Sequence, residues 1–219
     1  MERKLIAAQI RTIRHCNEME SELLAALFQP CTLQKGQLIQ IAKTHFRSVF
    51  FVCSGLIQLC QQSRQAKTKD AKAKPLRSLA VYQPSELFFF PFGKTTSRHH
   101  YQLHAITPCQ LFLADYPAIE KLIASRPSMM RHYVAIGEYY LQQTFQHLQL
   151  LQQPTAIHRY EQLAQRLGKH FYQIPNEYKA SYLGISRKHL TRISKAYLRK
   201  HTPSPHSLPE QETKRAEAS

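Results

Sequence analysis

One segment of this chain, IPNEYKASYLGISRKHLTRI, has the spacing of two short helices joined by a tight turn. Asn176 suits the start of the first helix, because its side chain can accept a hydrogen bond from a free backbone amide. Gly184 suits its end, since glycine adopts the left-handed backbone conformation there without a steric penalty. Ser186 then suits the cap of a second helix, with Ile185 and Leu190 at the positions of a hydrophobic staple. The segment predicts a helix-turn-helix.

The predicted second helix has a basic outer face. A period of 3.6 residues turns Leu190 and Ile193 inward against the first helix. The outward positions are Ser186, Arg187, Lys188, His189, Thr191, Arg192 and Lys195. Arginine near the start of such a helix can bond both acceptors of a guanine edge, and lysine and hydroxyl groups can hold phosphate. We therefore expect these residues to contact double-stranded DNA; the alternative is a solvated basic helix that binds nothing.

The charge of the chain favours the same class of partner. The formal net charge is +16, which suits a polyanion without separating DNA from RNA or an acidic membrane. Between Thr155 and His201, ten lysines and arginines stand against two glutamates, so the basic excess is concentrated around the predicted motif.

Other sequence signals exclude several classes of protein. No apolar run is long enough to cross a bilayer, and the charged N-terminal segment is not a secretion signal, so we expect a cytoplasmic protein without membrane contact. The five cysteines form no C-x-x-C pair, which favours reduced structural thiols over a metal site and leaves a redox switch as the alternative. The absence of a Gly-rich phosphate loop and of a G-x-S-x-G elbow predicts that the protein is not an enzyme.

Upstream of the motif, two patterns follow one another. From about Pro30 to Ala114, short segments rich in β-branched and aromatic residues alternate with turn residues, which predicts a small antiparallel barrel or roll. After Tyr116 the pattern is helical, with a long helix expected from Pro127 to about Gln152 and another from about Ala156 to Phe171. The chain is thus expected to be of the α+β class. Its expected parts are residues 1–115 (an N-terminal helix and a sensor-like β-roll), 116–153 (the long helix), 154–201 (the helix-turn-helix) and 202–219 (a disordered tail).

The long helix carries apolar residues at alternating steps of four and three, which is the pattern of a coiled-coil seam. The seam consists of Met130, Val134, Gly137, Leu141, Thr144, Leu148 and Leu151. A single helix-turn-helix reads few base pairs, so a homodimer that pairs along this seam is expected. Ile136, Tyr140 and Phe145 widen the apolar stripe, so the helix is expected to touch its own roll as well as a partner. The alternative is ordinary packing on its own domain alone.

A β-roll, a long helix and a C-terminal helix-turn-helix in this order resemble the Crp/Fnr family of bacterial transcription regulators. The resemblance covers residues 1–200 and is most specific in RYEQLAQRLGKHFYQIPNEYKASYLGISRKHLTRISK, which looks like the short C-terminal domain of Bacteroidetes members. It implies a homodimeric regulator with base contacts from Arg187, Lys188 and Arg192, and with Ser186 and His189 nearer the phosphates. It also implies RNA polymerase as a further partner.

The resemblance places an effector pocket in PSELFFFPFGKTTSRHH. Cyclic-nucleotide-binding members hold their ligand with a glycine–glutamate pair and a later arginine–serine pair. Glu86 and Leu87 match, but Ser85 replaces the glycine. At the position of the phosphate-binding arginine stands His99 or His100, with Arg98 adjacent. We therefore expect a pocket that does not bind cyclic AMP.

Haem-binding and redox-sensing members of the family supply an alternative function. Their ligands lie around the β-roll and the long helix, where this chain has His99, His100, His104, Cys109, Met129, Met130 and His132. A haem- or redox-responsive sensor that controls DNA or protein binding is therefore the second hypothesis, with haem as the possible cofactor. The sequence leaves open the effector, the operator and the direction of regulation.

Overall fold

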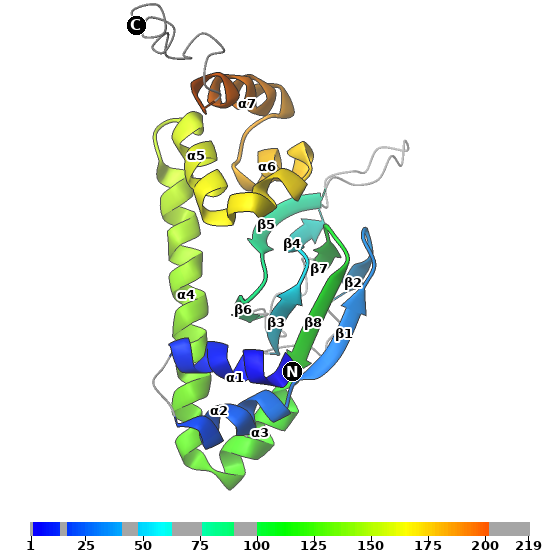
Figure 1. Ribbon diagram of the computed structural model, residues 1–219, viewed down its shortest axis with the longest axis vertical. Coiled ribbons are helices and arrows are strands. Elements are labelled where there is room, and N and C mark those ends of the chain that lie inside the picture. The colour runs from blue at the N-terminus through cyan, green and yellow to red at the C-terminus, as the bar shows by residue number, and fades with distance from the viewer. Residues whose placement is uncertain (1, 14–16, 41–47, 63–75, 90–99, 202–219) are drawn as a thin grey trace, which may run out of the picture.

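The computed structural model describes residues 2–13, 17–40, 48–62, 76–89 and 100–201. Helix α4 (Met130–Gln152) runs along the long axis of the molecule, with a β-roll at its side (Figure 1). At one end lie α1 (Glu2–Ile13), α2 (Glu18–Ala26), α3 (Tyr116–Ser125) and the 3-10 turn η3 (Pro127–Met129). At the other end lie α5 (Ala156–Leu167), the 3-10 segment η4 (Gly168–Gln173), α6 (Asn176–Tyr182) and α7 (Arg187–His201).

Two four-stranded antiparallel sheets form the roll. One has the order β1-β8-β3-β6 and the other β2-β7-β4-β5. The strands are β1 (Gln29–Leu33), β2 (Leu38–Gln40), β3 (Val49–Ser54), β4 (Ile57–Gln62), β5 (Leu76–Tyr82), β6 (Leu87–Phe89), β7 (His100–Ala105) and β8 (Cys109–Ala114). The predicted α+β class, with an antiparallel roll, a long helix and C-terminal helices, is confirmed.

Aromatic side chains of the strands pack against one another inside the roll, where residues of this type fit the pleated surface of a sheet. Phe88 stacks on Tyr82 with ring centroids 3.9 Å apart, and Phe50 stacks on Phe88 at 5.1 Å. A second cluster joins the first sheet to α1, α2 and α4 through residues such as Ile10 and Ile136.

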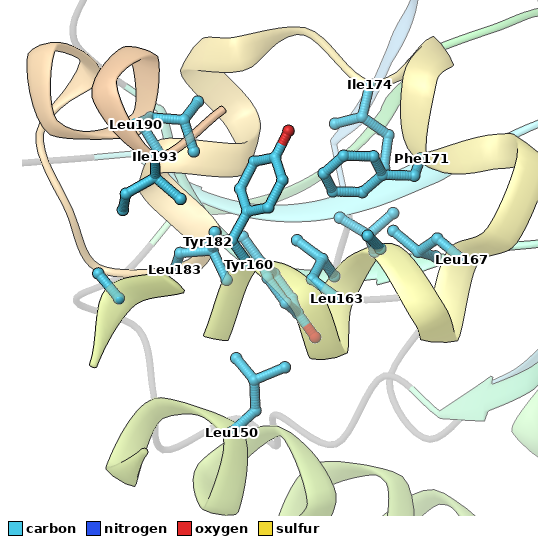
Figure 2. Packing of buried hydrophobic residues seen from close by; sticks show 14 of the residues in the cluster. Leu150, Tyr160, Leu163, Leu167, Phe171, Ile174, Tyr182, Leu183, Leu190 and Ile193 are labelled. Carbon is cyan, nitrogen blue, oxygen red and sulfur yellow. The ribbon is translucent and has the colours of Figure 1, made fainter. Parts of the chain in front are cut away.

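The C-terminal helices share a third cluster of buried side chains with their neighbours. Figure 2 shows Leu150 of α4 pointing toward the side chains of α5, α6 and α7. The same cluster contains three roll residues, Leu56, Val81 and Ile106. The apolar core is therefore continuous between the roll and the C-terminal helices.

One helix prediction needs correction. The helix expected to reach Phe171 ends at Leu167, because Gly168 takes a positive φ of 50° and the chain continues as the 3-10 segment η4. Phe171 is nevertheless buried, so its apolar character was informative even though its helix was not continuous.

None of the helices within the described ranges is long and apolar enough to cross a membrane. The predicted disordered tail, residues 202–219, lies outside the described residues.

Candidate nucleic-acid interface

The turn between α6 and α7 has the hydrogen bonds of a helix ending on glycine. Gly184 has φ of 66°, the left-handed conformation that glycine adopts most readily. The Ile185 amide donates to the Ala180 carbonyl at 3.0 Å, and the Gly184 amide donates to the Ser181 carbonyl at 3.3 Å. These two bonds satisfy carbonyls at the end of α6 that no helical amide can reach. The predicted stop at Gly184 is confirmed.

The two predicted helix caps differ in outcome. Ser186 caps α7, because its Oγ accepts from the His189 amide at 3.2 Å. Asn176 does not cap α6: Pro175 is the N-cap, Asn176 is the first helical residue, and no side-chain cap bond forms. A cap residue must itself be non-helical for its side chain to turn back to the free amides, and Asn176 stands one residue too late.

Buried apolar side chains hold α7 against α6. Leu183 and Leu190 have no exposed surface, and Ala180 and Ile193 are also buried. Ile185 is half-buried against the same cluster, as the predicted staple requires. The inward face of the helix-turn-helix is therefore the one that the 3.6-residue period indicated.

The outward face of α7 is open to solvent. All seven residues predicted to contact DNA are exposed, namely Ser186, Arg187, Lys188, His189, Thr191, Arg192 and Lys195. Arg187 forms an ion pair with Glu177 of α6. The basic side chains thus form one surface with a single acidic neighbour at its edge within the described contacts.

Two basic residues near the motif do not join this surface. Lys179 is 6% exposed, and its Nζ lies 4.2 Å from the centroid of the Phe171 ring. Burial lowers the pKa of this lysine. Arg166 points toward the roll, where it contacts Glu86. The local excess of positive charge that the sequence shows is therefore larger than the charge presented on the outer face.

The predicted seam of α4 is largely uncovered in the single chain. The side chains of Met130, Val134, Leu141 and Leu148 are each about half exposed, between 46% and 53%. A Cβ added at Gly137 would meet nothing within 4 Å, and Thr144 is exposed. Leu151 instead packs against the C-terminal cluster.

The three residues that widen the apolar stripe of α4 differ in how far they are buried. Ile136 is buried and Tyr140 is half-buried against the roll, as expected. Phe145 is 56% exposed and does not share in this packing. A 3.6-residue period places Phe145 next to Leu141 and Leu148, on the uncovered side of the helix.

The predicted effector region is described only in part. Leu87 is buried in β6, whereas Arg98 and His99 lie outside the described residues and His100 is placed only by its backbone at the start of β7. Ser85 has φ of 71°, the left-handed conformation. Glu86 lies in the turn before β6, and its carboxylate accepts from Arg166 at 3.3 Å and from the Gln83 amide at 3.1 Å.

Several solved structures have a similar arrangement of a roll, a long helix and C-terminal helices. FixK2 from Bradyrhizobium japonicum covers 79% of this chain and 85% of its own, with a TM-score of 0.58 and 16% identity. CLP from Xanthomonas campestris, a c-di-GMP-responsive global regulator, covers 84% and 93%, with a TM-score of 0.58 and 16% identity. A candidate crp/fnr-family transcriptional regulator from Eubacterium rectale covers 84% and 85%, with a TM-score of 0.57 and 11% identity. The chain has the Crp/Fnr fold.

No protein-family model and no curated protein matches the sequence of the chain. At the identities found, the similarity concerns the fold alone. Ser85 stands where the resemblance places a glycine, and its positive φ is the conformation that glycine favours.

Ser85→Gly should therefore stabilise the protein. A non-glycine residue in the left-handed region costs about 1–2 kcal/mol. Glycine also has more conformational freedom in the unfolded chain, which lowers the stability of the variant and offsets part of this gain. We expect the free energy of unfolding to rise by up to about 1 kcal/mol, measured by urea titration. Ser125→Gly, within the last turn of α3 where no positive φ is required, is the control and should destabilise or leave stability unchanged. Equal effects at both sites would contradict the explanation.

Where the structure describes them, the residues expected to hold a cyclic nucleotide or haem make contacts within the protein. The Glu86 carboxylate is bonded within the protein rather than directed at an open ribose site. Among the proposed haem ligands, His104 bonds Gln58, His132 bonds Glu20, Cys109 and Met129 are buried, and Met130 is exposed on the seam. Over the described ranges, no group of three or more His, Cys, Asp or Glu side chains is placed to hold a metal ion.

Burial affects the thiols of the four described cysteines. Cys16 lies outside the described residues, and the other four are free thiols. Burial raises the pKa of the Cys60 thiol to about 12 and also raises those of Cys31, Cys53 and Cys109. A raised pKa disfavours the thiolate, which is the form that oxidants attack.

Proposed function

We propose that the protein is a homodimeric, sequence-specific DNA-binding transcription regulator of the Crp/Fnr family. The observation that carries this proposal is the exposed basic face of α7 on a helix-turn-helix whose inner face is fully packed. Such a helix fits the major groove, where arginine and lysine can bond guanine and the remaining side chains can hold phosphate. Residues 186–189 at its N-terminus would then meet base edges and the neighbouring phosphates first.

We infer the dimer from the uncovered apolar stripe of α4. Monomeric proteins rarely expose a contiguous patch of large apolar side chains, and a seam of this period suits a second copy of the same helix. Two recognition helices one DNA turn apart would read a two-fold-symmetric site.

We assign a role to each part of the chain: residues 1–115 form a sensor-like part, 116–153 dimerise, 154–201 bind DNA and 202–219 form a disordered tail. The proposal includes RNA polymerase as a further partner and an N-terminal effector-like part that does not bind cyclic AMP.

The function is tested by selecting binding sites from random DNA duplexes with the purified protein and footprinting the enriched sequences. We expect protection of two half-sites about 10 base pairs apart, centre to centre. Arg192→Ala should weaken binding about 10- to 100-fold and relax the base preference at the position that it contacts. Arg126→Ala removes the same charge beyond the far end of α4 and should leave affinity unchanged. Enrichment of no sequence, or equal loss in both variants, would refute the proposal.

Glu177→Gln should strengthen DNA binding. In the free protein Arg187 is paired with Glu177, so it must leave this partner before it can reach a base. Both side chains are well exposed, at 73% and 44%, and an exposed pair contributes little. We therefore expect only a two- to fivefold gain, about what removal of one weak competing pair and one nearby negative charge provides.

The gain is measured by equilibrium titration of a labelled duplex at two salt concentrations. Glu120→Gln on α3 neutralises an exposed glutamate far from α7 and is the matched control. If Glu177→Gln weakened binding instead, the Arg187–Glu177 pair would be an orienting contact rather than a competitor.

A further inference from the structure

Arg166 of α5 joins the C-terminal helices to the roll. Its Nη1 donates to the Tyr182 hydroxyl of α6 at 2.8 Å, and its Nη2 donates to the Val81 carbonyl of β5 at 2.9 Å. The same Nη2 lies 3.3 Å from Glu86 Oε1. In return, the Gln83 side-chain amide donates to the Arg166 carbonyl at 3.3 Å. One arginine therefore contacts both halves of the junction.

Glu86 is fixed in the roll independently of Arg166. Its second carboxylate oxygen accepts from the Gln83 amide, and its carbonyl accepts from the Val52 amide of β3 at 3.0 Å. The Ser85 amide donates to the Val52 carbonyl at 2.8 Å. The glutamate thus presents a preorganised acceptor to whatever approaches, which lowers the entropic cost of pairing.

Because Glu86 is buried, its charged carboxylate depends on Arg166 as a partner. The Glu86 side chain is 13% exposed, and burial raises its pKa even though Arg166 and the Gln83 amide favour the charged form. A buried carboxylate left without its cation is costly, so removal of Arg166 from this position is opposed. The contact is therefore more than a surface ion pair.

Further contacts link the same two parts of the protein. The Ser78 amide of the edge strand β5 donates to Ser181 Oγ of α6 at 2.8 Å. The Tyr178 ring lies edge-on to His104 at 5.3 Å, and Tyr182 stacks on His147 of α4 at 4.0 Å. Figure 1 shows α6 lying beside the end of β5.

Apolar side chains of the roll and of the C-terminal helices pack together at this junction, but a space is left beside them. A cavity of about 160 Å³ remains beside it, lined in part by Tyr82, Tyr140, Tyr182 and Arg166. Directional polar contacts, which specify one orientation, are therefore needed where close packing is incomplete.

We propose that Arg166, Tyr182, Glu86 and the Val81 carbonyl form an interdomain latch that fixes the orientation of the helix-turn-helix relative to the roll without a ligand. The protein's own arginine takes the carboxylate that the resemblance assigns to an effector. The latched arrangement leaves the outer face of α7 uncovered, so the latch orients this face and does not block it. Its consequence for DNA rests on the proposed function, whereas its opening is measurable without DNA.

Glu86→Gln tests the latch in the full-length protein, because it removes the charge and keeps the shape. Hydrogen–deuterium exchange is measured at the Ser78 amide, whose acceptor is Ser181, and across peptides spanning 77–82 and 178–183. Loss of one charge-assisted bond should speed exchange there about five- to tenfold, since exchange follows the local opening equilibrium. Arg166→Lys and Tyr182→Phe should act in the same direction, because lysine lacks the two-armed geometry and phenylalanine lacks the hydroxyl.

Glu161→Gln is the matched control. It removes the ion pair with Lys200, which joins α5 to α7 and does not reach the roll, so exchange at Ser78 should not change. Affinity of Glu86→Gln for a selected duplex should fall about three- to tenfold, because the loosened helices must be reoriented on binding. Unchanged exchange in all three latch variants would overturn the latch, and tighter DNA binding by Glu86→Gln would overturn its orienting role. Faster exchange with no DNA binding by the wild type would refute the proposed function and leave the latch standing.

Discussion

Replacing Leu141 and Leu148 together by glutamate should convert the protein from a dimer to a monomer. The two side chains are 53% and 49% exposed in the single chain and lie on the stripe that we propose as the seam. Pairing two such helices would bury four carboxylates without partners, and each unpaired buried charge opposes association by several kcal/mol. The dimer dissociation constant should therefore rise at least about 100-fold, because each 1.4 kcal/mol is a factor of ten.

Mass measurement by light scattering during gel filtration would follow the change, since one chain has a mass of 25.5 kDa. The variant should also lose at least about 100-fold in affinity for a two-half-site duplex, because each half-site must then bind a separate chain. Its circular dichroism should remain that of the wild type, as both positions are on the surface of the single chain.

The control places the same charges elsewhere on α4. Gln142 and Gln146 are exposed and lie off the proposed seam by the 3.6-residue period. Gln142→Glu together with Gln146→Glu should leave the protein dimeric. A wild-type protein that is already monomeric at micromolar concentration would contradict the seam outright, and dissociation of both double variants would show a general effect of charge on the helix.

The parts of the fold that the sequence predicts correctly are those encoded over a few residues. Gly184 and Ser186 act through their own backbone neighbours, so the turn and the second cap follow from local spacing. The same local information was available at Asn17, whose side chain accepts from the Glu20 amide at 2.7 Å and caps α2. That asparagine and the glutamate three residues later form a capping signal that could have predicted this helix.

Contacts between distant segments could not be predicted in this way. Arg166 and Glu86 are 80 residues apart, and no periodicity connects them. One signal was present, because Arg166 follows Leu163 by three residues and so stands beside the apolar face of α5. Phe145 is a second example: it widens the apolar stripe of α4, and the sequence does not tell whether such a residue packs on the roll or stays half exposed, where a second chain could cover it.

Leu190→Ala should strongly destabilise the C-terminal helices. The Leu190 side chain has no exposed surface and lies with Leu183 and Ile193 in the cluster between α6 and α7. Truncating a fully buried leucine loses its transfer free energy and leaves a cavity, which together cost about 2–5 kcal/mol. We expect the free energy of unfolding, measured by urea titration followed by circular dichroism, to fall by about this amount.

Leu198→Ala makes the same chemical change on the same helix, but its side chain is 49% exposed. Its effect should stay within about 0.5 kcal/mol, because little packing is lost at the surface. The difference between the two variants therefore measures burial rather than helix propensity, which is identical for both substitutions. DNA affinity should follow the same order, since α7 can present its basic face only while Leu190 holds the helix against α6. Equal destabilisation by both variants would mean that α7 is not packed through Leu190, and the orientation of the whole outer face would then have to be reassigned.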